Sequence, residues 1–178
     1  MCFYRRAVLE QWLLIEADPA AVAFCERPGY VQTKERKYLV DFWVRYADRQ
    51  ELIFVIETDD EEWDKHWRDE LGESSIPIRC VPRIELIALR AWIDNWQRML
   101  PCIIATRGLI APTMHAAIER FVKQPQTLIT IEREFSNGDL IVARAAVFGL
   151  LHQGRVSASE LHTHPLSLLT HFNAVGAR

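Results

Sequence analysis

The first hundred residues alternate between a helical and an extended pattern of apolar positions. Residues 5–17 place apolar side chains three and four positions apart, which predicts a helix with a broad apolar face. Asp18 is expected to cap a short second helix that ends at Ala23. Residues 38–46 alternate between two faces, which predicts a strand. Residues 52–57 are apolar on both faces until the final glutamate, as in a central strand covered on both sides.

Further elements complete an α/β pattern in this part of the chain. Residues 30–33 are a weak strand candidate, and a helix is predicted to begin at Thr58. A strand is predicted over 76–81 and a long helix over 84–100. The order helix, strands, helix, strand, helix predicts an α/β domain.

The remainder of the chain has a different pattern. Short helices followed by a small strand are typical of a winged helix-turn-helix. The sequence therefore predicts two domains, residues 1–108 and 109–178. The predicted elements of the second domain are helices over 111–122, 128–135 and 140–152, the last of them capped by Asp139, and an alternating strand pattern over 155–161.

The composition narrows the class of protein. The 178 residues include 21 basic and 24 acidic side chains, and this net charge of −3 excludes a basic coat over the whole surface. The four cysteines are scattered without a CxxC pair, as expected of buried thiols in a reducing compartment. No apolar run reaches the length of a membrane span. We therefore expect a soluble, cytoplasmic protein with no membrane partner.

Carboxylates mark the ends of the predicted hairpin VDFWVRYADRQELIFVIETDD. Asp41 opens its first strand and Glu57 closes its second. Metal-dependent cleavage of a phosphodiester needs oxygen ligands on rigid supports, and strand ends provide such supports. In the common nuclease arrangement an Asp lies on one strand, and an acid and a Lys one residue apart lie on the next. Strand-end carboxylates that are only solvated are the simpler alternative.

The residues around this hairpin resemble the TnsA family, the endonuclease subunit of heteromeric transposases related to restriction endonucleases. The similarity rests on LEQWLLIEADPAAVAFCERP and LVDFWVRYADRQELIFVIET, beside a family pattern of LE, LLEFDPDV, QP, DFLV and VEVK. It implies a restriction-endonuclease-like mixed sheet flanked by helices, followed by a small winged-helix-like α+β module. It also implies that Glu10, Asp41 and Glu57 hold Mg²⁺, which activates the attacking water.

The chain departs from the family pattern at the lysine of VEVK. An alignment without a gap places Val55 at the acid and Glu57 at the lysine. A turn two residues longer places Glu57 at the acid and Asp59 at the lysine. An acid in place of the lysine reverses the charge that stabilises the transition state. Lys37 and Lys65 are the nearby lysines that could replace it.

The resemblance implies a DNA endonuclease subunit that acts at transposon ends beside an integrase-type transposase. Three possibilities remain open at this point. The chain is either an active nuclease or a catalytically inactive DNA-binding and assembly subunit of such a complex. A stand-alone DNA-binding regulator that uses only the C-terminal module is the third possibility, and the negative net charge argues mildly against it.

Other polar residues have simpler interpretations. The histidines near the C-terminus fit no common zinc spacing and are expected at the surface or facing DNA. These are His152, His162, His164 and His171. A set of basic residues near the predicted site either touches phosphates or forms a solvated face. These are Arg5, Arg6, Lys34, Arg36 and Lys37.

Overall fold

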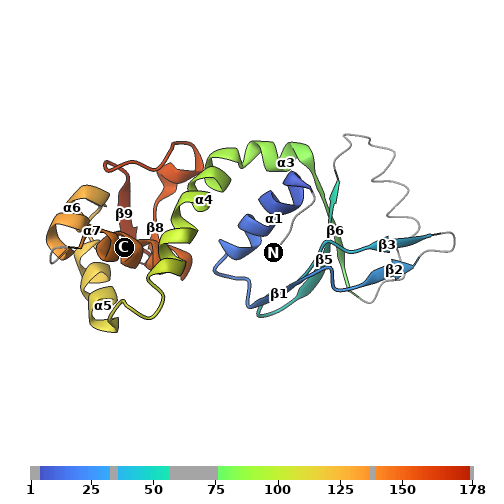
Figure 1. Ribbon diagram of the computed structural model, residues 1–178, viewed down its shortest axis with the longest axis horizontal. Coiled ribbons are helices and arrows are strands. Elements are labelled where there is room, and N and C mark those ends of the chain that lie inside the picture. Colours follow the sequence, from blue (N-terminus) through green and yellow to red (C-terminus); the bar gives the residue numbers. More distant parts are fainter. Residues whose placement is uncertain (1–4, 33–35, 57–75, 137–138, 177–178) are drawn as a thin grey trace. The chain divides into compact units, whose positions relative to one another are not determined.

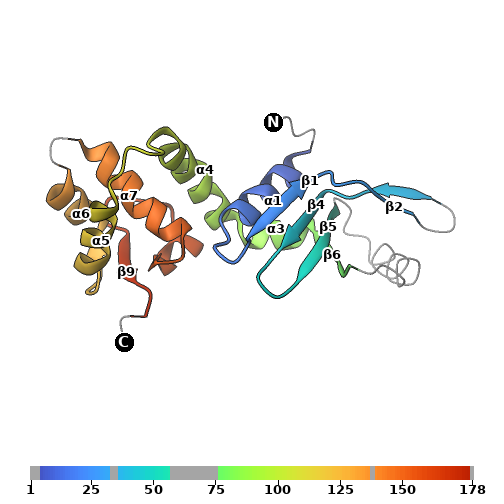
Figure 2. The ribbon, with the colours of Figure 1, turned by 90° about the horizontal axis from the view of Figure 1, so that it is seen from below.

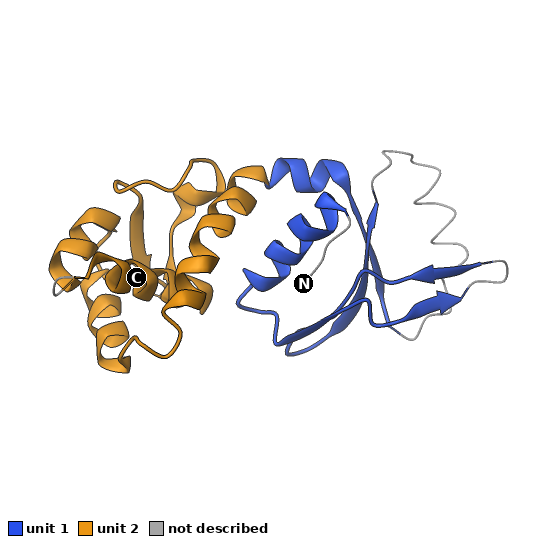
Figure 3. Cartoon of the chain, in the orientation of Figure 1, with its two compact units in different colours: residues 1–89 blue, residues 90–178 orange. Residues whose placement is uncertain are grey.

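The computed structural model describes residues 5–32, 36–56, 76–136 and 139–176. The helix expected from Thr58, and with it Glu57, Asp59 and Lys65, lies outside the described residues. The chain divides into two compact units, residues 1–89 and 90–178 (Figure 3). Among the described helices, none is both long and apolar enough to cross a membrane.

Unit 1 contains one mixed sheet and a separate two-stranded ribbon (Figure 1). The sheet has the order β1-β4-β5-β6, in which β4 runs antiparallel to both β1 and β5, and β6 runs parallel to β5. The ribbon pairs β2 with β3. The elements are α1 (Arg6–Glu16), β1 (Ala23–Glu26), β2 (Tyr30–Gln32), β3 (Lys37–Leu39), β4 (Phe42–Arg45), β5 (Gln50–Ile56), β6 (Ile78–Pro82) and α3 (Arg83–Ala88).

The core of unit 1 lies between the sheet and its helices. Alternate residues of β4, Phe42 and Val44, are fully buried, as are Ile53 of β5 and Val81 of β6. Ala7 and Ile15 of α1 and Leu86 of α3 join the same cluster. The helical spacing of residues 5–17 is therefore confirmed, because that apolar face packs on the sheet.

Two local predictions in unit 1 are wrong. The expected strand over 38–46 is interrupted at residues 40–41, because β3 pairs with β2 whereas β4 pairs with β1 and β5. The expected short helix after Asp18 is absent from these described residues. The Asp18 carboxylate instead accepts a hydrogen bond from the backbone N–H of Ala20, at 2.9 Å, within a turn. The chain then enters β1, whose backbone pairs with β4.

Unit 2 combines helices with a small antiparallel sheet of order β7-β9-β8 (Figure 2). The three helices predicted from the sequence are confirmed. The elements are α4 (Arg90–Ala105), α5 (Pro112–Phe121), β7 (Gln126–Thr127), α6 (Leu128–Phe135), α7 (Leu140–His152), β8 (Val156–Ser157), the 3-10 helix η1 (Ser159–His162) and β9 (His171–Ala174). The alternating pattern of 155–161 forms a strand only over β8, because η1 follows it.

Helix α7 is the central element of unit 2. It packs against α4, α5 and α6, and its side chains from Ala145 to Leu151 are all buried. A helix that is apolar all round is expected to be covered on every side. The Asp139 side chain caps it by accepting from the N–H of Ile141 at 2.9 Å, as the sequence predicts.

The long helix expected over 84–100 is two helices, α3 and α4, with a break at Leu89. The two units separate at this break rather than after residue 108. Helix α4 belongs to unit 2 because its apolar side packs against α7 and η1, where Ile93, Trp96 and Met99 are buried. The periodicity of 84–100 is continuous, so the change of partner at Leu89 is decided by packing.

Candidate functional site

Asp41 lies at one end of the sheet of unit 1, immediately before β4. Its backbone N–H donates to the carbonyl of Ile53 at 3.1 Å, and its carbonyl accepts from the N–H of Arg27 at 2.9 Å. These bonds fix the residue between β5 and the segment that follows β1. The Asp41 side chain is 12% exposed. Its carboxylate is therefore held on a rigid support, as a catalytic or ligating acid requires.

Both oxygens of the Asp41 carboxylate have partners. Oδ2 accepts from the backbone N–H of Val55 at 2.8 Å, and Oδ1 forms an ion pair with the Arg5 guanidinium. The other terminal nitrogen of Arg5 donates to the carbonyl of Val55 at 3.1 Å. Arg5, Asp41 and Val55 thus form a closed set of contacts, which we call the Asp41 site. A charge-assisted contact between guanidinium and carboxylate is among the stronger polar interactions of proteins.

Arg5 reaches the site from the start of α1. It occupies the N-cap position with an extended backbone and makes no side-chain cap hydrogen bond. Its side chain is 40% exposed, so water reaches the pair from one side. The sequence indicated Arg5 only as one of several positive charges near the hairpin, because no local pattern specifies which carboxylate an arginine faces.

Glu10, the second predicted site residue, lies on the covered side of α1 and is 9% exposed. Its carboxylate accepts from Nε of Arg6, one turn earlier, at 2.8 Å. The two described candidates, Glu10 and Asp41, are thus each paired with an arginine of residues 5–6. Glu57, the third, lies outside the described residues.

The described residues include two of the three predicted magnesium ligands, Glu10 and Asp41. Within residues 5–32, 36–56, 76–136 and 139–176, no three histidine, cysteine or acidic side chains gather closely enough to hold a metal ion. Val55, which a gapless alignment places at the second acid, is buried in the core and offers only its peptide group. Arg5 and a metal ion would compete for the same Asp41 oxygen. We therefore derive no reaction step through a metal.

Lys37 is one of the two lysines predicted as replacements for the lysine of the family pattern VEVK. It lies on β3 opposite Gln32 of β2, with its side chain exposed. Its strand belongs to the ribbon rather than to the sheet that carries Asp41. Lys65, the other candidate, lies outside the described residues.

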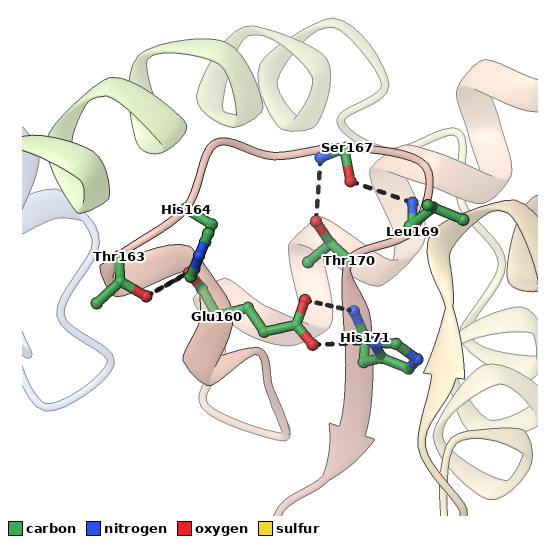
Figure 4. Close-up of polar contacts among 7 residues, drawn as sticks. All are labelled: Glu160, Thr163, His164, Ser167, Leu169, Thr170 and His171. Atoms are coloured by element: carbon green, nitrogen blue, oxygen red, sulfur yellow. Dashed lines mark hydrogen bonds and ion pairs between the residues drawn. The ribbon is translucent and has the colours of Figure 1, made fainter.

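A second group of polar contacts lies in unit 2, in the loop between η1 and β9 (Figure 4). The Glu160 carboxylate faces the ring Nδ1 of His171 at 2.9 Å and also accepts from the His171 backbone N–H at 3.4 Å. Thr163 Oγ1 contacts Nδ1 of His164 at 2.9 Å. The N–H of Ser167 donates to Oγ1 of Thr170 at 3.0 Å. These contacts give the loop a defined course although most of its side chains are exposed.

Asn95 of α4 anchors the same loop. Its side-chain N–H₂ donates to the carbonyls of Leu161 and His164, each at 2.8 Å, and its Oδ1 accepts from the N–H of Leu166 at 2.7 Å. The Asn95 side chain is 1% exposed and therefore excluded from water. Its three hydrogen bonds to the loop replace those that water would otherwise make. No sequence pattern predicted a role for Asn95. Its signal is a polar residue three positions after Trp92 and four before Met99, on the apolar side of the helix.

The C-terminal histidines occupy different environments. His162, His164 and His171 are exposed, which confirms the surface position expected of them. The His162 ring stacks on Trp92 of α4, with ring centroids 4.1 Å apart. His152 is only half-exposed and lies edge-on against Trp96. His162 and His152 thus each pack against a tryptophan of α4.

A half-buried ion pair joins α6 to α7. The Glu132 side chain is 4% exposed and pairs with Nε of Arg144, whose side chain is 38% exposed. The hydrogen bond that Arg144 donates to Glu132 raises the pKa of Arg144, against the opposing effect of burial. This pair ties α6 to α7.

No family model, curated protein or solved structure matches the chain. The Asp41 site is therefore interpreted from its own geometry together with the sequence resemblance of residues 8–57. Its geometry allows an electrostatic and structural role for Asp41.

Proposed function

We propose that this chain is a catalytically inactive, nuclease-derived subunit of a DNA transposition complex. In this proposal it descends from TnsA-like endonucleases, binds DNA, and works beside an integrase-type transposase that carries out the chemistry. The observation that carries the proposal is the Asp41 site. There Arg5 forms an ion pair with the carboxylate that a nuclease would use to bind its metal.

The arrangement of unit 1 supports the nuclease ancestry. Asp41 directly precedes β4, and β5 is the neighbouring strand in the sheet, as the nuclease arrangement of carboxylates requires. The mixed sheet and the helices of its core are compatible with a restriction-endonuclease-like fold. Burial of Val55 at the position of the second acid supports loss of catalysis.

The arrangement of unit 2 supports a winged-helix-like module. Helices α5, α6 and α7 are followed by β8 and β9, and β7 completes a small antiparallel sheet. In a helix-turn-helix the second helix inserts into the major groove through its exposed side chains. Here that helix is α7, which exposes only the first turn, including Leu140 and Ile141, and is otherwise mostly covered. This burial favours a subunit role over a stand-alone regulator that reads DNA through α7.

A cleavage and binding assay tests the proposal. Labelled duplex DNA and supercoiled plasmid would be incubated with the purified chain in Mg²⁺ or Mn²⁺, alone and with an integrase-type transposase. We expect binding to duplex DNA without nicking by this chain. We also expect Asp41→Asn to leave binding and any transposase-dependent cleavage unchanged.

The matched control is Asp48→Asn, which makes the same change in charge in the turn between β4 and β5. Asp48 is 79% exposed and its neighbour in the ion pair is Arg49. Metal-dependent nicking that Asp41→Asn abolishes and Asp48→Asn preserves would contradict the proposal of an inactive nuclease. Absence of any binding to duplex DNA would contradict the proposal as a whole.

A further inference from the structure

The β2–β3 ribbon (residues 30–32 and 37–39) has one face anchored and one face exposed. Val31 of β2 and Tyr38 of β3 face each other in the register and pack against Val40 and Phe54. This packing fixes the inner face of the ribbon on the main sheet. The ribbon extends beyond the sheet in both views of the fold (Figures 1 and 2).

The outer face consists of two cross-strand pairs. Tyr30 lies opposite Leu39, and Gln32 lies opposite Lys37. All four side chains are exposed, and Tyr30 is 68% exposed. Residues directly opposite one another in an antiparallel ribbon point to the same side. The outer face therefore presents an aromatic ring, an amide and an ammonium group together.

The segment that carries the ribbon is basic within an acidic chain. Residues 27–39 contain four basic residues and one acidic residue, whereas the whole chain contains 21 and 24. Arg27 and Arg36, which flank the two strands, are exposed like Lys37. Because the chain as a whole is negatively charged, this local positive charge favours a specific polyanionic partner over nonspecific binding to polyanions.

The base of the ribbon joins the sheet at the Asp41 site. The N–H of Val40 donates to the carbonyl of Gly29 at 3.0 Å, and the N–H of Arg27 donates to the carbonyl of Asp41 at 2.9 Å. The turn that carries Asp48 and Arg49 lies at the other end of β4 and β5. A partner bound to the ribbon would thus lie at the sheet end where a nuclease would hold its substrate.

We propose that the β2–β3 ribbon is a DNA-binding arm whose outer face enters the major groove of duplex DNA. This inference rests on the proposed function, since it names the surface that holds the DNA. The major groove admits a two-stranded β-ribbon as well as a helix. Helix α7 exposes little beyond its first turn, so the ribbon supplies the groove contact that α7 does not.

The outer-face residues have distinct roles in this arm. Lys37 and Arg36 neutralise phosphates, which gives affinity and dependence on salt. Gln32 presents donor and acceptor groups to base edges, where a glutamine pairs with adenine. Tyr30 and Leu39 contact the apolar edges of bases or sugars. The phosphate contacts position the arm, and the amide and aromatic groups supply preference between sequences.

The test measures the anisotropy of a fluorescein-labelled 30-base-pair duplex, with the full chain at several salt concentrations. We expect the double variant Arg36→Glu/Lys37→Glu to weaken binding roughly 50-fold at 0.1 M salt. The slope of log K against log salt should fall by about 2, one for each lost phosphate contact. Tyr30→Ala should weaken binding without a change in that slope.

The matched control is Arg45→Glu/Arg49→Glu, which makes the same change in charge in the same unit at the opposite end of the sheet. Both arginines are exposed. We expect this control to bind within about threefold of the unchanged chain, because only long-range charge is altered. Thermal unfolding of each variant verifies that it is folded.

Three outcomes would overturn the ribbon proposal. Equal loss of binding in both double variants would indicate a diffuse charge effect. Unchanged binding in Arg36→Glu/Lys37→Glu would remove the ribbon from the interface and leave the proposed function standing. Binding to vesicles of anionic phospholipid without binding to the duplex would assign the basic face to a membrane surface, and would contradict the proposed function as well.

Discussion

The two units place their polar groups in different settings. In unit 1 the Asp41 carboxylate is 12% exposed at the end of a sheet, and its arginine partner is 40% exposed. In unit 2 the Glu132 carboxylate is 4% exposed beside an arginine that is 38% exposed, and the Asn95 amide is 1% exposed. Glu132 and Asn95 tie helices or loops together inside the unit. A polar group at the end of a sheet can exchange its partner for a ligand, whereas a buried one stabilises a single arrangement. We therefore expect substitution of these polar groups to lower the free energy of unfolding more in unit 2 than in unit 1.

Removal of Arg144 should produce the largest effect. Arg144→Ala leaves the buried Glu132 carboxylate without its ion pair, and we expect the free energy of unfolding to fall by about 3 kcal/mol. Chemical denaturation followed by circular dichroism measures this change. Arg133→Ala, an exposed arginine of α6, is the control and should cost less than about 0.5 kcal/mol. Equal effects of the two substitutions would contradict a structural role for the Glu132–Arg144 pair.

Removal of the Asn95 amide should come next. Asn95→Ala leaves the carbonyls of Leu161 and His164 and the N–H of Leu166 without this partner, at an expected cost of about 2 kcal/mol. Hydrogen exchange of the Leu166 amide should accelerate more than exchange within α5. Gln97→Ala changes an exposed amide of the same helix and should leave both measurements unaltered. Slow exchange of Leu166 in Asn95→Ala would show that the loop does not depend on this anchor.

Neutralisation of Asp41 should cost less, about 1 kcal/mol. In Asp41→Asn the side-chain oxygen still accepts from the N–H of Val55, while the ion pair with the half-exposed Arg5 is lost. Thermal unfolding beside Asp48→Asn measures the difference. A loss as large as that of Arg144→Ala would remove the contrast between the two units. A small loss also keeps the DNA-binding assays on Asp41→Asn interpretable.

The smallest expected effect depends on pH. Burial, and then the positive charge of Arg155, lower the pKa of His115 in α5 below its ordinary 6.5. Between pH 6.5 and this lower pKa the unfolded chain binds a proton that the folded chain does not. The stability contributed by neutral His115 is therefore complete above pH 6.5 and is lost as pH falls through that window.

Unfolding measured from pH 7 to pH 5 tests this assignment. His115→Gln should show a weaker fall in stability over this range than the unchanged chain. His164→Gln, which alters an exposed histidine, should keep the original dependence. An unaltered pH profile in His115→Gln would assign the pH dependence to other groups.

Much of the fold follows from local pattern. The apolar spacing of residues 5–17 locates α1, and the continuous apolar run of 52–56 locates β5. The cap residue Asp139 and the apolar run after it locate α7. Such predictions hold because the periodicity of burial is set by the backbone geometry of each element.

The candidate site was predictable only in part. Sequence alone placed Asp41 on the predicted hairpin and revealed that the lysine of the family pattern is absent. It did not reveal that Arg5 reaches Asp41, since 36 residues separate the two. Nor did it reveal the anchor from Asn95 to Leu166, across 71 residues. Contacts of this kind leave no periodic pattern in the sequence, because either polar partner could equally lie on a solvated surface.

The sequence by itself determined where apolar faces lie, where helices begin, and which charged residues are present. The tertiary structure decided how they pair: the helical pattern of 84–100 divides at Leu89, the strand pattern of 38–46 divides between a ribbon and a sheet, and Asp41 meets an arginine. Local patterns fix the conformation of a segment, but its partner is selected by the burial of surfaces that are distant in sequence.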